Sequence, residues 1–379
     1  MMSAEDASRA AHQQRKQRSV DVLAEVSLRQ AVFASTGRHL FTDMDPVVWL
    51  TGFKPMGQAG AVLDDTGDLV LFVEGAWEAA RARRTVTNAD VVASAAPLEQ
   101  AARRVLGRGL SKAASAGVRK LNTVEYRAIT GGGAIELRPV DPEIDARARL
   151  KDELEMTCYE RATEIAEEGF RSLLEHLRPG MTDVEAEALI ERRLRELGSD
   201  DAFVFLSASA RNRAVQRPWG RLLLPGDILI TELSPSVGGV FAQICRTVSI
   251  GEPSAALVTS HQLLCDALAE GIAACKPGQS VSGVVAAIDD RLIAEGYGQY
   301  CRPPYMRVRG HGMGFGSVAP GDFLSRNATV LQHGDTFVLH PNQMLPTAGY
   351  LMCGEPVRVG ADRAELMSAA VAELAVVAA

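Results

Sequence analysis

Hydrophobic residues recur at the spacing of a buried strand in residues 226–251, GDILITELSPSVGGVFAQICRTVSIG. A Gly-Asp turn signal precedes Ile228, Ile230 and Leu233, which predict one strand, and the GG pair after them permits a hairpin. Val240–Ile250 then predicts a second strand that returns beside the first. The stretch therefore predicts two paired strands.

Short apolar runs alternate with helix-like segments in residues 21–140, which predicts a small α/β domain. Residues 1–20 are polar, and we expect them to be a flexible N-terminus. The elements predicted for the domain are strands at Val47–Leu50, Gly60–Leu63 and Leu69–Val73, and helices at Trp77–Arg84 and Leu98–Leu106.

A supersecondary unit occurs twice in residues 141–379, which follow a Gly- and Pro-rich linker. Each copy is a helix, a turn with a Pro-Gly pair, and a second helix, and Thr182 with Glu185 predicts a capping box in the first copy. The repeat predicts an internally duplicated α+β domain. The four predicted helices are Ala146–Leu177, Val184–Leu197, Leu263–Ala274 and Val281–Glu295.

Composition narrows the class of protein without changing this division. The chain has 379 residues, 47% hydrophobic and 23% charged, which is enough for two domains with substantial cores. The formal net charge of −7 and the lack of a basic stripe argue against a nucleic-acid partner. We expect no membrane span, since no apolar run reaches about 18 residues.

The cysteines and the first residues of the chain indicate the cellular compartment. The 6 cysteines are scattered and form no C-x-x-C pair, which indicates reduced thiols rather than disulfides or a structural zinc site. The charges near the start are not followed by an apolar segment, which argues against a secretory signal. We therefore expect a cytoplasmic protein that acts on a small molecule.

Two motifs carry the strongest chemical signal. Glu232 and Gln243 are 11 residues apart on the predicted hairpin, and the second lies in the phrase GG-x-x-x-Q-x-C-R-T. The other motif, GHGMG, places His311 between glycines that let a ligand approach the backbone closely. Both resemble motifs of the superfamily that contains creatinase, prolidase and methionine aminopeptidase. The resemblance implies a pseudo-symmetric α+β catalytic domain, the pita-bread fold, behind a small creatinase-like N-terminal α/β domain.

The resemblance also implies altered metal ligands, so the chain is identified as a divergent member. Dinuclear members hold two metal ions through two Asp, one His and two Glu side chains. Gln243 stands where the second Asp is expected, and His340, in LQHGDTFVLHPNQM, stands where the first Glu is expected. A dinuclear aminopeptidase is therefore not expected. The last Glu falls on one of Met352, Cys353, Gly354 or Glu355.

Three functions are compatible with these residues. The first, closest in style to creatinase, is a metal-independent hydrolase of a non-peptide C–N bond in a small metabolite of specialised biosynthesis. The second is an enzyme with one iron, manganese or zinc ion held by His311, His340 and a carboxylate, Glu232 or Glu355. The third is a binding module without catalysis. The first is the preferred hypothesis, and it requires no cofactor.

The preferred hypothesis assigns roles to single side chains. His311 or His340 serves as general acid and base, because the ordinary pKa of histidine lies near neutrality. Glu232 or Glu355 holds a cationic substrate group by charge-assisted hydrogen bonds. Cys245 faces the same side of its strand as the ligand positions. It is either a thiol nucleophile activated by His311 or a buried core residue.

Further residues are expected to bind the substrate. Gln243 lies in the site by the resemblance. Arg217 lies ahead of the first site strand, where creatinase has an essential His, and it either binds an anionic substrate group or is a surface charge. Tyr305 and Arg309 belong to an aromatic and basic run before His311 that either lines the pocket or is an ordinary loop.

A last motif concerns the N-terminal domain. The phrase D-P-x-x-x-L-T-G-F, which ends at Phe53, resembles the N-terminal domain of creatinases and prolidases. Creatinases are homodimers in which this domain closes the pocket of the other subunit. The resemblance thus implies a homodimer in which Phe53 reaches the partner's substrate.

Overall fold

The computed structural model describes residues 4–38, 41, 43–316, 319–370 and 372–379. The chain divides into two compact units, Met1–Leu154 and Glu155–Ala379. The boundary lies further along the chain than the one predicted between residues 140 and 141. Each unit has its own sheets and its own hydrophobic core.

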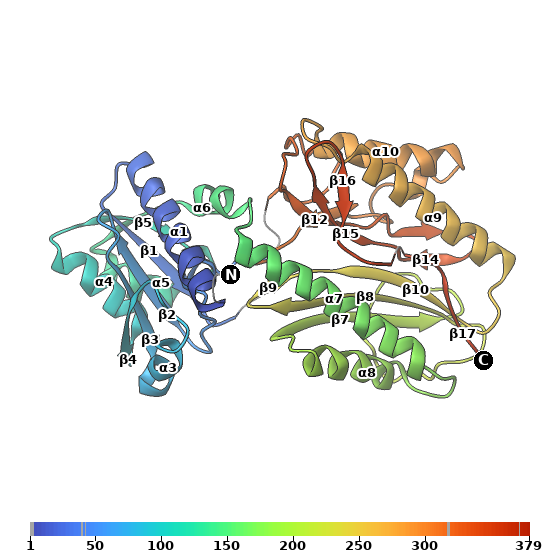
Figure 1. Cartoon of the computed structure of the whole chain (residues 1–379), viewed down its shortest axis with the longest axis horizontal. Helices are drawn as coiled ribbons and strands as arrows, with labels where there is room; N and C mark the ends of the chain where they lie inside the picture. Colours follow the sequence, from blue (N-terminus) through green and yellow to red (C-terminus); the bar gives the residue numbers. More distant parts are fainter. Residues whose placement is uncertain (1–3, 39–40, 42, 317–318, 371) are drawn as a thin grey trace. The chain divides into compact units, whose positions relative to one another are not determined.

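The described part of unit 1 contains a six-stranded sheet in the order β4-β3-β2-β1-β5-β6 (Figure 1). β2 pairs antiparallel with β1 and β3, and the other neighbours are parallel. The strands are β1 (Gln30–Ser35), β2 (Ala59–Asp64), β3 (Leu69–Glu74), β4 (Asp90–Ser94), β5 (Lys112–Ala116) and β6 (Glu136–Pro139). The helices are α1 (Ala4–Glu25), α2 (Pro46–Thr51), α3 (Gly75–Ala82), α4 (Pro97–Gly107), α5 (Thr123–Ile129) and α6 (Asp141–Ala148).

One predicted strand of unit 1 is a helix. Val47–Leu50 lies in α2, where the Asp45 carboxylate accepts the N–H of Val47 at 2.9 Å and Pro46 occupies the first helical turn. All six residues of α2 are buried, and a short apolar run fits a buried helix as well as a strand. The prediction was wrong because the Asp-Pro start signal outweighs the apolar run. The other predicted strands and helices of this unit are present as β2, β3, α3 and α4.

The flexible N-terminus predicted for residues 1–20 forms the helix α1 from Ala4 onward, and residues 1–3 lie outside the described residues. Arg15 is the residue that anchors it, since its side chain is buried among unit 1 residues. Its guanidinium lies 2.7 Å from the carboxylate of Asp152 and donates to the Trp49 carbonyl at 3.0 Å. A polar helix with one buried, paired cation has no apolar stripe that the sequence pattern could reveal.

The long helix predicted over Ala146–Leu177 is interrupted. It forms α6 and α7 (Glu153–His176), separated by residues 149–152. Asp152 in this break is held by the ion pair with Arg15. The tertiary pairing therefore overrides a local sequence that favours a continuous helix.

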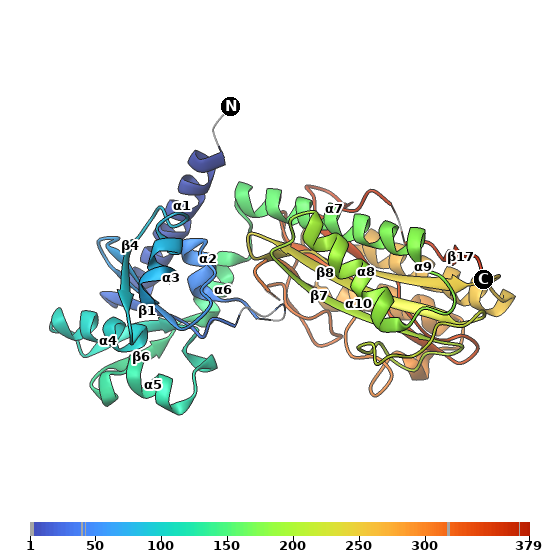
Figure 2. The same cartoon turned by 90° about the horizontal axis from the view of Figure 1, so that it is seen from below.

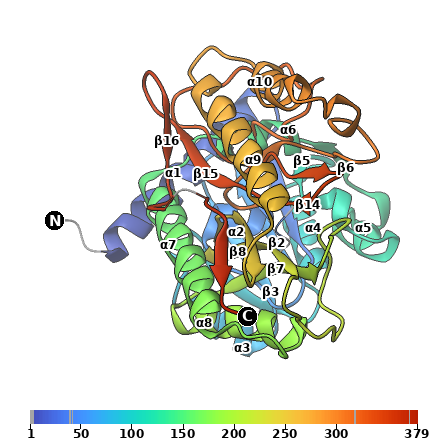
Figure 3. The ribbon, with the colours of Figure 1, turned by 90° about the vertical axis from the view of Figure 1, so that its right-hand side faces the viewer.

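The described part of unit 2 contains a five-stranded sheet, ordered β17-β10-β8-β7 with β9 on β8, and a four-stranded sheet, ordered β11-β12-β15-β16. β17 (Ala375–Val377) pairs parallel with β10, and Figure 3 shows β17 as the red strand next to the C-terminus. The other strands are β7 (Asp201–Ser209), β8 (Ile228–Val237), β9 (Val240–Phe241), β10 (Ile244–Ile250), β11 (Gly310–Gly312), β12 (Thr336–Leu339), β13 (Gln343–Leu345), β14 (Gly349–Leu351), β15 (Glu355–Val359) and β16 (Ala364–Leu366). The helices are α7, α8 (Asp183–Glu196), α9 (Ala255–Ala274) and α10 (Val281–Ala294).

The repeat predicted from the sequence is present in unit 2. α7 and α8 pack on the outer face of the five-stranded sheet, and α9 and α10 cover the outer side of the four-stranded sheet (Figure 1, Figure 2). Thr182 and Ser280 cap the second helix of each copy with their hydroxyl groups. The result is the predicted pseudo-symmetric α+β domain.

The inner faces of the two sheets meet along a short seam. Cys245 of β10 and Gly354, just before β15, exchange both backbone hydrogen bonds at 3.1 Å. Side chains on the inner faces of both sheets are therefore brought together at this seam. Within the described residues, no helix combines the length and apolarity that a membrane crossing requires.

Candidate active site

The first wall of the site is the inner face of β7, β8 and β10. Directly paired residues of antiparallel strands point to the same face, and Glu232 pairs with Phe205 on one side and Cys245 on the other. From Ile228 to Ser236, Glu232 is the residue of β8 that keeps some exposure to solvent, while its neighbours are buried. Part of the Glu232 residue thus stays open to solvent, unlike its neighbours on β8.

Gln243 extends the first wall. It lies two residues before Cys245, and its Nε2 donates to the Cys245 sulfur at 3.5 Å. Its Oε1 and the hydroxyl of Ser234, both buried, have no hydrogen-bond partner within the described residues. Buried polar atoms without partners are costly, so this wall offers two polar atoms that a bound ligand would satisfy.

The second wall comes from the four-stranded sheet. His311 lies in β11 and His340 directly follows β12, and their ring centroids are 5.4 Å apart. His311 Nδ1 donates to the Gly312 carbonyl at 3.1 Å, which places the proton on Nδ1 and the lone pair on Nε2. His340 Nδ1 is buried and has no partner in the part of the chain that the structure describes.

Gly354 joins the two walls. A Cβ atom at this glycine would lie 2.7 Å from the Cβ of His340 and 3.1 Å from the Cβ of Cys245. The distances show that His340 of the second wall and Cys245 of the first wall flank the same backbone position. The absent side chain is what permits this close approach.

Gly354→Ala should therefore disturb the seam. We expect a loss of about 1–3 kcal/mol in the free energy of unfolding, measured by urea denaturation, because both clashing atoms are close to the backbone. Gly298→Ala is the matched control: its nearest contact is 3.3 Å, to the side chain of Ile293, which is exposed and can move. Equal stability of the two variants would contradict the described packing.

Burial controls the charges of both walls. It raises the pKa of Glu232 to about 7, with Arg307 opposing the change. It lowers the pKa of His340 to about 3, helped by the neighbouring His311, and it lowers the pKa of His311 as well. At neutral pH the site thus combines one half-ionised carboxyl with two neutral imidazoles.

Cys245 is a wall residue rather than an activated thiol. Burial, followed by the negative charge of Glu232, raises its pKa well above the ordinary range of a thiol. Its sulfur contacts the amides of Gln243 at 3.5 Å and Asn342 at 3.9 Å. A nucleophilic thiol needs the opposite environment, a base or a positive charge beside it. The core alternative predicted for this residue fits the structure.

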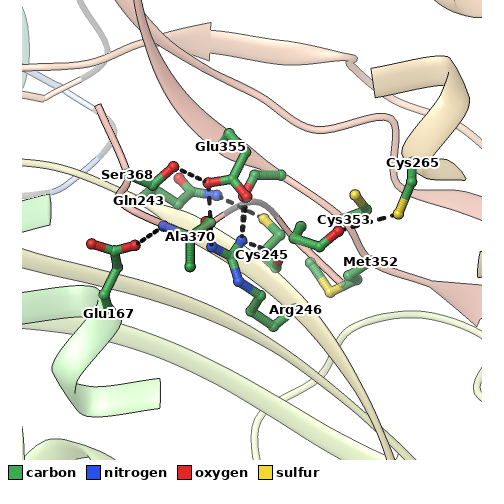
Figure 4. A network of polar contacts seen from close by, with 12 residues as sticks. Glu167, Gln243, Cys245, Arg246, Cys265, Met352, Cys353, Glu355, Ser368 and Ala370 are labelled. Atoms are coloured by element: carbon green, nitrogen blue, oxygen red, sulfur yellow. Dashed lines mark hydrogen bonds and ion pairs between the residues drawn. The ribbon is translucent and has the colours of Figure 1, made fainter. Parts of the chain in front are cut away.

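Glu355 points away from the site. The Arg246 Nη1 lies 3.1 Å from its Oε1, and the Ser368 hydroxyl donates to its Oε2 at 2.6 Å (Figure 4). Among the four positions predicted for the last ligand, Gly354 is the one that faces Cys245, and it has no side chain. The charge of Glu355 is committed to a structural ion pair, so the substrate role predicted for it does not fit this geometry.

The residues predicted around the site have different positions. Arg309 is buried with its guanidinium 2.7 Å from Asp289, which places its charge in an ion pair rather than toward a ligand. Tyr305 is exposed and stacks edge-on with Tyr300. Arg217 is exposed and lies 5.6 Å above the ring of Phe203.

Phe203 indicates which face of the five-stranded sheet lies next to Arg217. Its ring shares the inner face with Ser234, to which it is paired across the strands. Arg217 lies beside this ring and also within electrostatic range of Glu187 on α8, and its substrate role stays a prediction. Phe53, in contrast, is 2% exposed in unit 1, with the Arg81 guanidinium 4.4 Å above its ring. It is a core residue there, and the homodimer stays a prediction.

Arg307 belongs to the aromatic and basic run before His311, which was expected either to line the pocket or to be an ordinary loop. It is exposed, and its charge lowers the pKa of Glu232 and of both site histidines. Within the described residues it forms no salt bridge. Of the three arginines that precede His311, the sequence alone could not distinguish the one that reaches the site from Arg309, whose charge pairs with α10.

The donor set of the site differs from the two Asp, one His and two Glu side chains that hold two metal ions. The described residues contain no group of three His, Cys, Asp or Glu side chains placed to hold a metal ion. Gln243 contributes a neutral amide, and Glu232, the carboxyl nearest to it on this wall, has a pKa near neutrality. Hard divalent ions are held by several ionised oxygen ligands, which these two walls do not provide.

A duplicated α+β domain whose two sheets converge on one polar site is the architecture of a pita-bread hydrolase. The model of Metallopeptidase family M24 matches residues 157–365, more than half of the chain, and the chain therefore belongs to this family. It thus lies within the superfamily of creatinase, prolidase and methionine aminopeptidase, as the motifs indicated.

Similar proteins agree with this assignment. The chain is 26% identical over 323 residues to the uncharacterized peptidase YqhT of Bacillus subtilis, which covers 82% of this chain and 87% of that protein. It is 22% identical over 244 residues to a Xaa-Pro dipeptidase of Pyrococcus furiosus, covering 63% of this chain and 68% of that protein.

Solved structures share the fold over nearly the whole chain. The X-Pro aminopeptidase of Thermotoga maritima superposes with a TM-score of 0.84 at 19% identity, over 96% of this chain and 99% of the other. The prolidase of Pyrococcus horikoshii gives a TM-score of 0.83 at 17% identity, over 95% and 99%. Sequence identity this low supports a shared fold, and the reaction has to be inferred from the residues of the site.

Proposed function

We propose that this chain hydrolyses a C–N bond in a small anionic metabolite without a bound metal ion. The observation that supports this most directly is the donor set of the two walls. It consists of one carboxyl with a pKa near 7, one amide and two neutral imidazoles. Peptidases with two metal ions need a carboxylate-rich site to activate water, and the described residues place no such set here.

Glu232 is the proposed general acid and base. A catalytic group works best when its pKa lies near the working pH, and Glu232 meets this condition while His340, with a pKa of about 3, does not. The ionised carboxyl accepts a proton from the attacking water. The protonated carboxyl then returns a proton to the departing nitrogen.

The imidazoles are proposed to orient the reacting groups. The ring of His311 is held by the hydrogen bond that its Nδ1 donates to the Gly312 carbonyl. His340 carries the buried, unpartnered Nδ1 described above. As neutral groups they hydrogen-bond to water and to the substrate oxygen without adding charge. This role differs from the proton transfer predicted for them from the sequence.

Arg307 is proposed to bind the anionic group of the substrate. Its exposed guanidinium acts on the pKa of Glu232, His311 and His340, so it lies within electrostatic range of all three. A planar guanidinium matches a carboxylate through two hydrogen bonds. Arg217, beside Phe203, offers a second positive charge. The site therefore favours a substrate with a carboxylate near the scissile C–N bond.

The first experiment combines metal analysis with a substrate screen. We expect less than about 0.1 metal ion per chain by elemental mass spectrometry, and full activity after chelation, because the donor set is poor. The screen should compare N-acyl and amidino compounds, each as the free acid and as its methyl ester, with Xaa-Pro dipeptides. We expect hydrolysis of the free acids, and little of their esters.

The outcome separates the three functions considered from the sequence. Activity that is lost on chelation and restored by added manganese, iron or zinc would overturn the metal-independent reaction. Hydrolysis of Xaa-Pro dipeptides as the preferred substrates would overturn the non-peptide assignment. Binding of an anionic compound without turnover would leave a binding module.

A further inference from the structure

A second cluster of reactive groups lies in unit 2, on α9. The Cys265 sulfur lies 3.5 Å from Nδ1 of His261, one helical turn earlier, and 3.2 Å from the carbonyl oxygen of Ala372. The side chain of Cys353, just before the seam, lies near enough to Cys265 for the two thiols to shift each other's pKa. Figure 4 labels both cysteines. Three groups with thiol or imidazole chemistry thus converge outside the active site.

Cys265 also borders a hollow that leads to it. The hollow has a volume of about 400 Å³, and its lining is mostly apolar. Leu268 and Ile272 of α9 form one side, and Ala364 and Leu366 of β16 contribute to the other. Cys265 is partly exposed, while Cys353 is fully buried. A small apolar molecule can therefore reach the first sulfur and not the second.

The environment lowers the pKa of Cys265. The side chain of Cys353 is the largest cause that lowers this pKa, and His261 lowers it further. The same pairing, together with burial, raises the pKa of Cys353. The pair thus consists of an accessible thiol with a lowered pKa and a buried thiol with a raised pKa. His261 is itself buried, and its Nε2 has no partner within the described residues.

We propose that Cys265 is a peroxide-reactive thiol for which Cys353 is the resolving cysteine. The hollow would admit a small or apolar hydroperoxide to the Cys265 sulfur, and His261 and Cys353 surround that sulfur on its protein side. Reactive cysteines are accessible, have a lowered pKa and often stand beside a second cysteine. All three features occur together here.

The reaction is balanced by the two thiols. The Cys265 thiolate attacks the outer peroxide oxygen, the O–O bond breaks, and the leaving alkoxide takes a proton and departs as an alcohol, or as water from hydrogen peroxide. Cys265 is then a sulfenic acid. The Cys353 sulfur attacks the Cys265 sulfur, the S–O bond breaks, and water leaves with the thiol proton. The two thiols are oxidised to a disulfide and the peroxide is reduced.

The disulfide is expected to alter the position of residues in the active site. The backbone N–H of Cys353 donates to Oδ1 of Asn342 at 3.1 Å, and Nδ2 of Asn342 contacts the Cys245 sulfur at 3.9 Å. Gly354, which joins the two walls, is the next residue after Cys353. Movement of Cys353 toward Cys265 would therefore act on the first wall through these contacts.

The test is peroxide treatment of the full chain followed by mass spectrometry of the intact protein and its peptides. One arm uses hydrogen peroxide and the other uses cumene hydroperoxide, an apolar probe. We expect one disulfide per chain, between the peptides of Cys265 and Cys353. For each peroxide, the rate with Cys265 is divided by the rate of the same peroxide with a free thiol. If the apolar lining guides the oxidant, this ratio should be several-fold higher for cumene hydroperoxide than for hydrogen peroxide. Equal ratios would assign hydrogen peroxide as the oxidant.

Two variants divide the reaction into its steps. Cys353→Ser should stop at the sulfenic acid of Cys265, which dimedone traps, while Cys265→Ser should give neither product. Cys275, at the end of the same helix and buried, is the internal control and should stay reduced because burial raises its pKa. The proposal is overturned if other cysteines are oxidised before Cys265, or if oxidised Cys265 is never found linked to Cys353.

Discussion

Replacing Arg246 with methionine is expected to lower the free energy of unfolding by about 3–5 kcal/mol at pH 7, the cost of leaving a buried charge without its partner. Arg246 is 4% exposed and Glu355 is 0% exposed, and their charged groups lie 3.1 Å apart. The change also removes the hydrogen bond from Arg246 to the Gly354 carbonyl at 2.8 Å. Urea denaturation followed by circular dichroism measures the effect.

Two further variants separate charge from packing. Arg246→Met combined with Glu355→Leu should recover part of the lost stability, because no buried carboxyl is then left unpaired. Arg192→Met removes an exposed ion pair with Glu196 on α8 and should leave stability unchanged. A loss below about 1 kcal/mol in Arg246→Met would show that Glu355 is not held as described and would reopen its role as a site residue.

Glu232→Gln is expected to reduce kcat/KM by about 100- to 10,000-fold, the usual contribution of a general acid or base. In wild-type protein the pH profile of kcat/KM should show a limb with a pKa of about 7, the value that burial gives Glu232. The variant should lack that limb. Ser234→Ala, two residues away on the same face, is the control and should keep it. An unchanged limb in Glu232→Gln would assign the titration to another group.

The same substitution has an effect on stability that requires no substrate. The pKa of Glu232 rises from 4.5 in the unfolded chain to about 7 in the folded chain, so between these values the folded state binds more protons. Stability should therefore fall as pH rises through this window. The full interval corresponds to on the order of 3 kcal/mol, and Glu232→Gln should not show the decline. Below pH 4.5 the two proteins should respond alike to pH.

The fold was largely accessible from the sequence because its signals are local. The hairpin of β8 and β10 has alternating apolar residues and a glycine turn, and α8 and α10 have hydroxyl caps. The wrong predictions concern segments whose structure depends on tertiary contacts. α1 depends on the ion pair of Arg15 with Asp152, whose partners are 137 residues apart. No local pattern predicts such a pair.

The site was accessible only in part. Glu232, Gln243, Cys245, His311 and His340 were identified from motif spacing, and the structure brings them to the two walls that meet at the seam. Glu355 was misplaced because one residue decides which face a strand presents, and the sequence left the alignment of the last ligand open. Arg307 was not selected because loop geometry, rather than spacing, carries its charge toward the site.

The pairing of β17 with β10 also bears on the order in which the protein forms during synthesis. Val248 in the middle of the chain pairs with Ala375 near its end, and the seam joins Cys245 to a residue more than 100 positions later. Unit 1 makes its sheet from the first part of the chain and can be completed early. In unit 2 the edge of β10 stays unpaired until residues 375–377 have been synthesised, and an unpaired strand edge can pair with another chain.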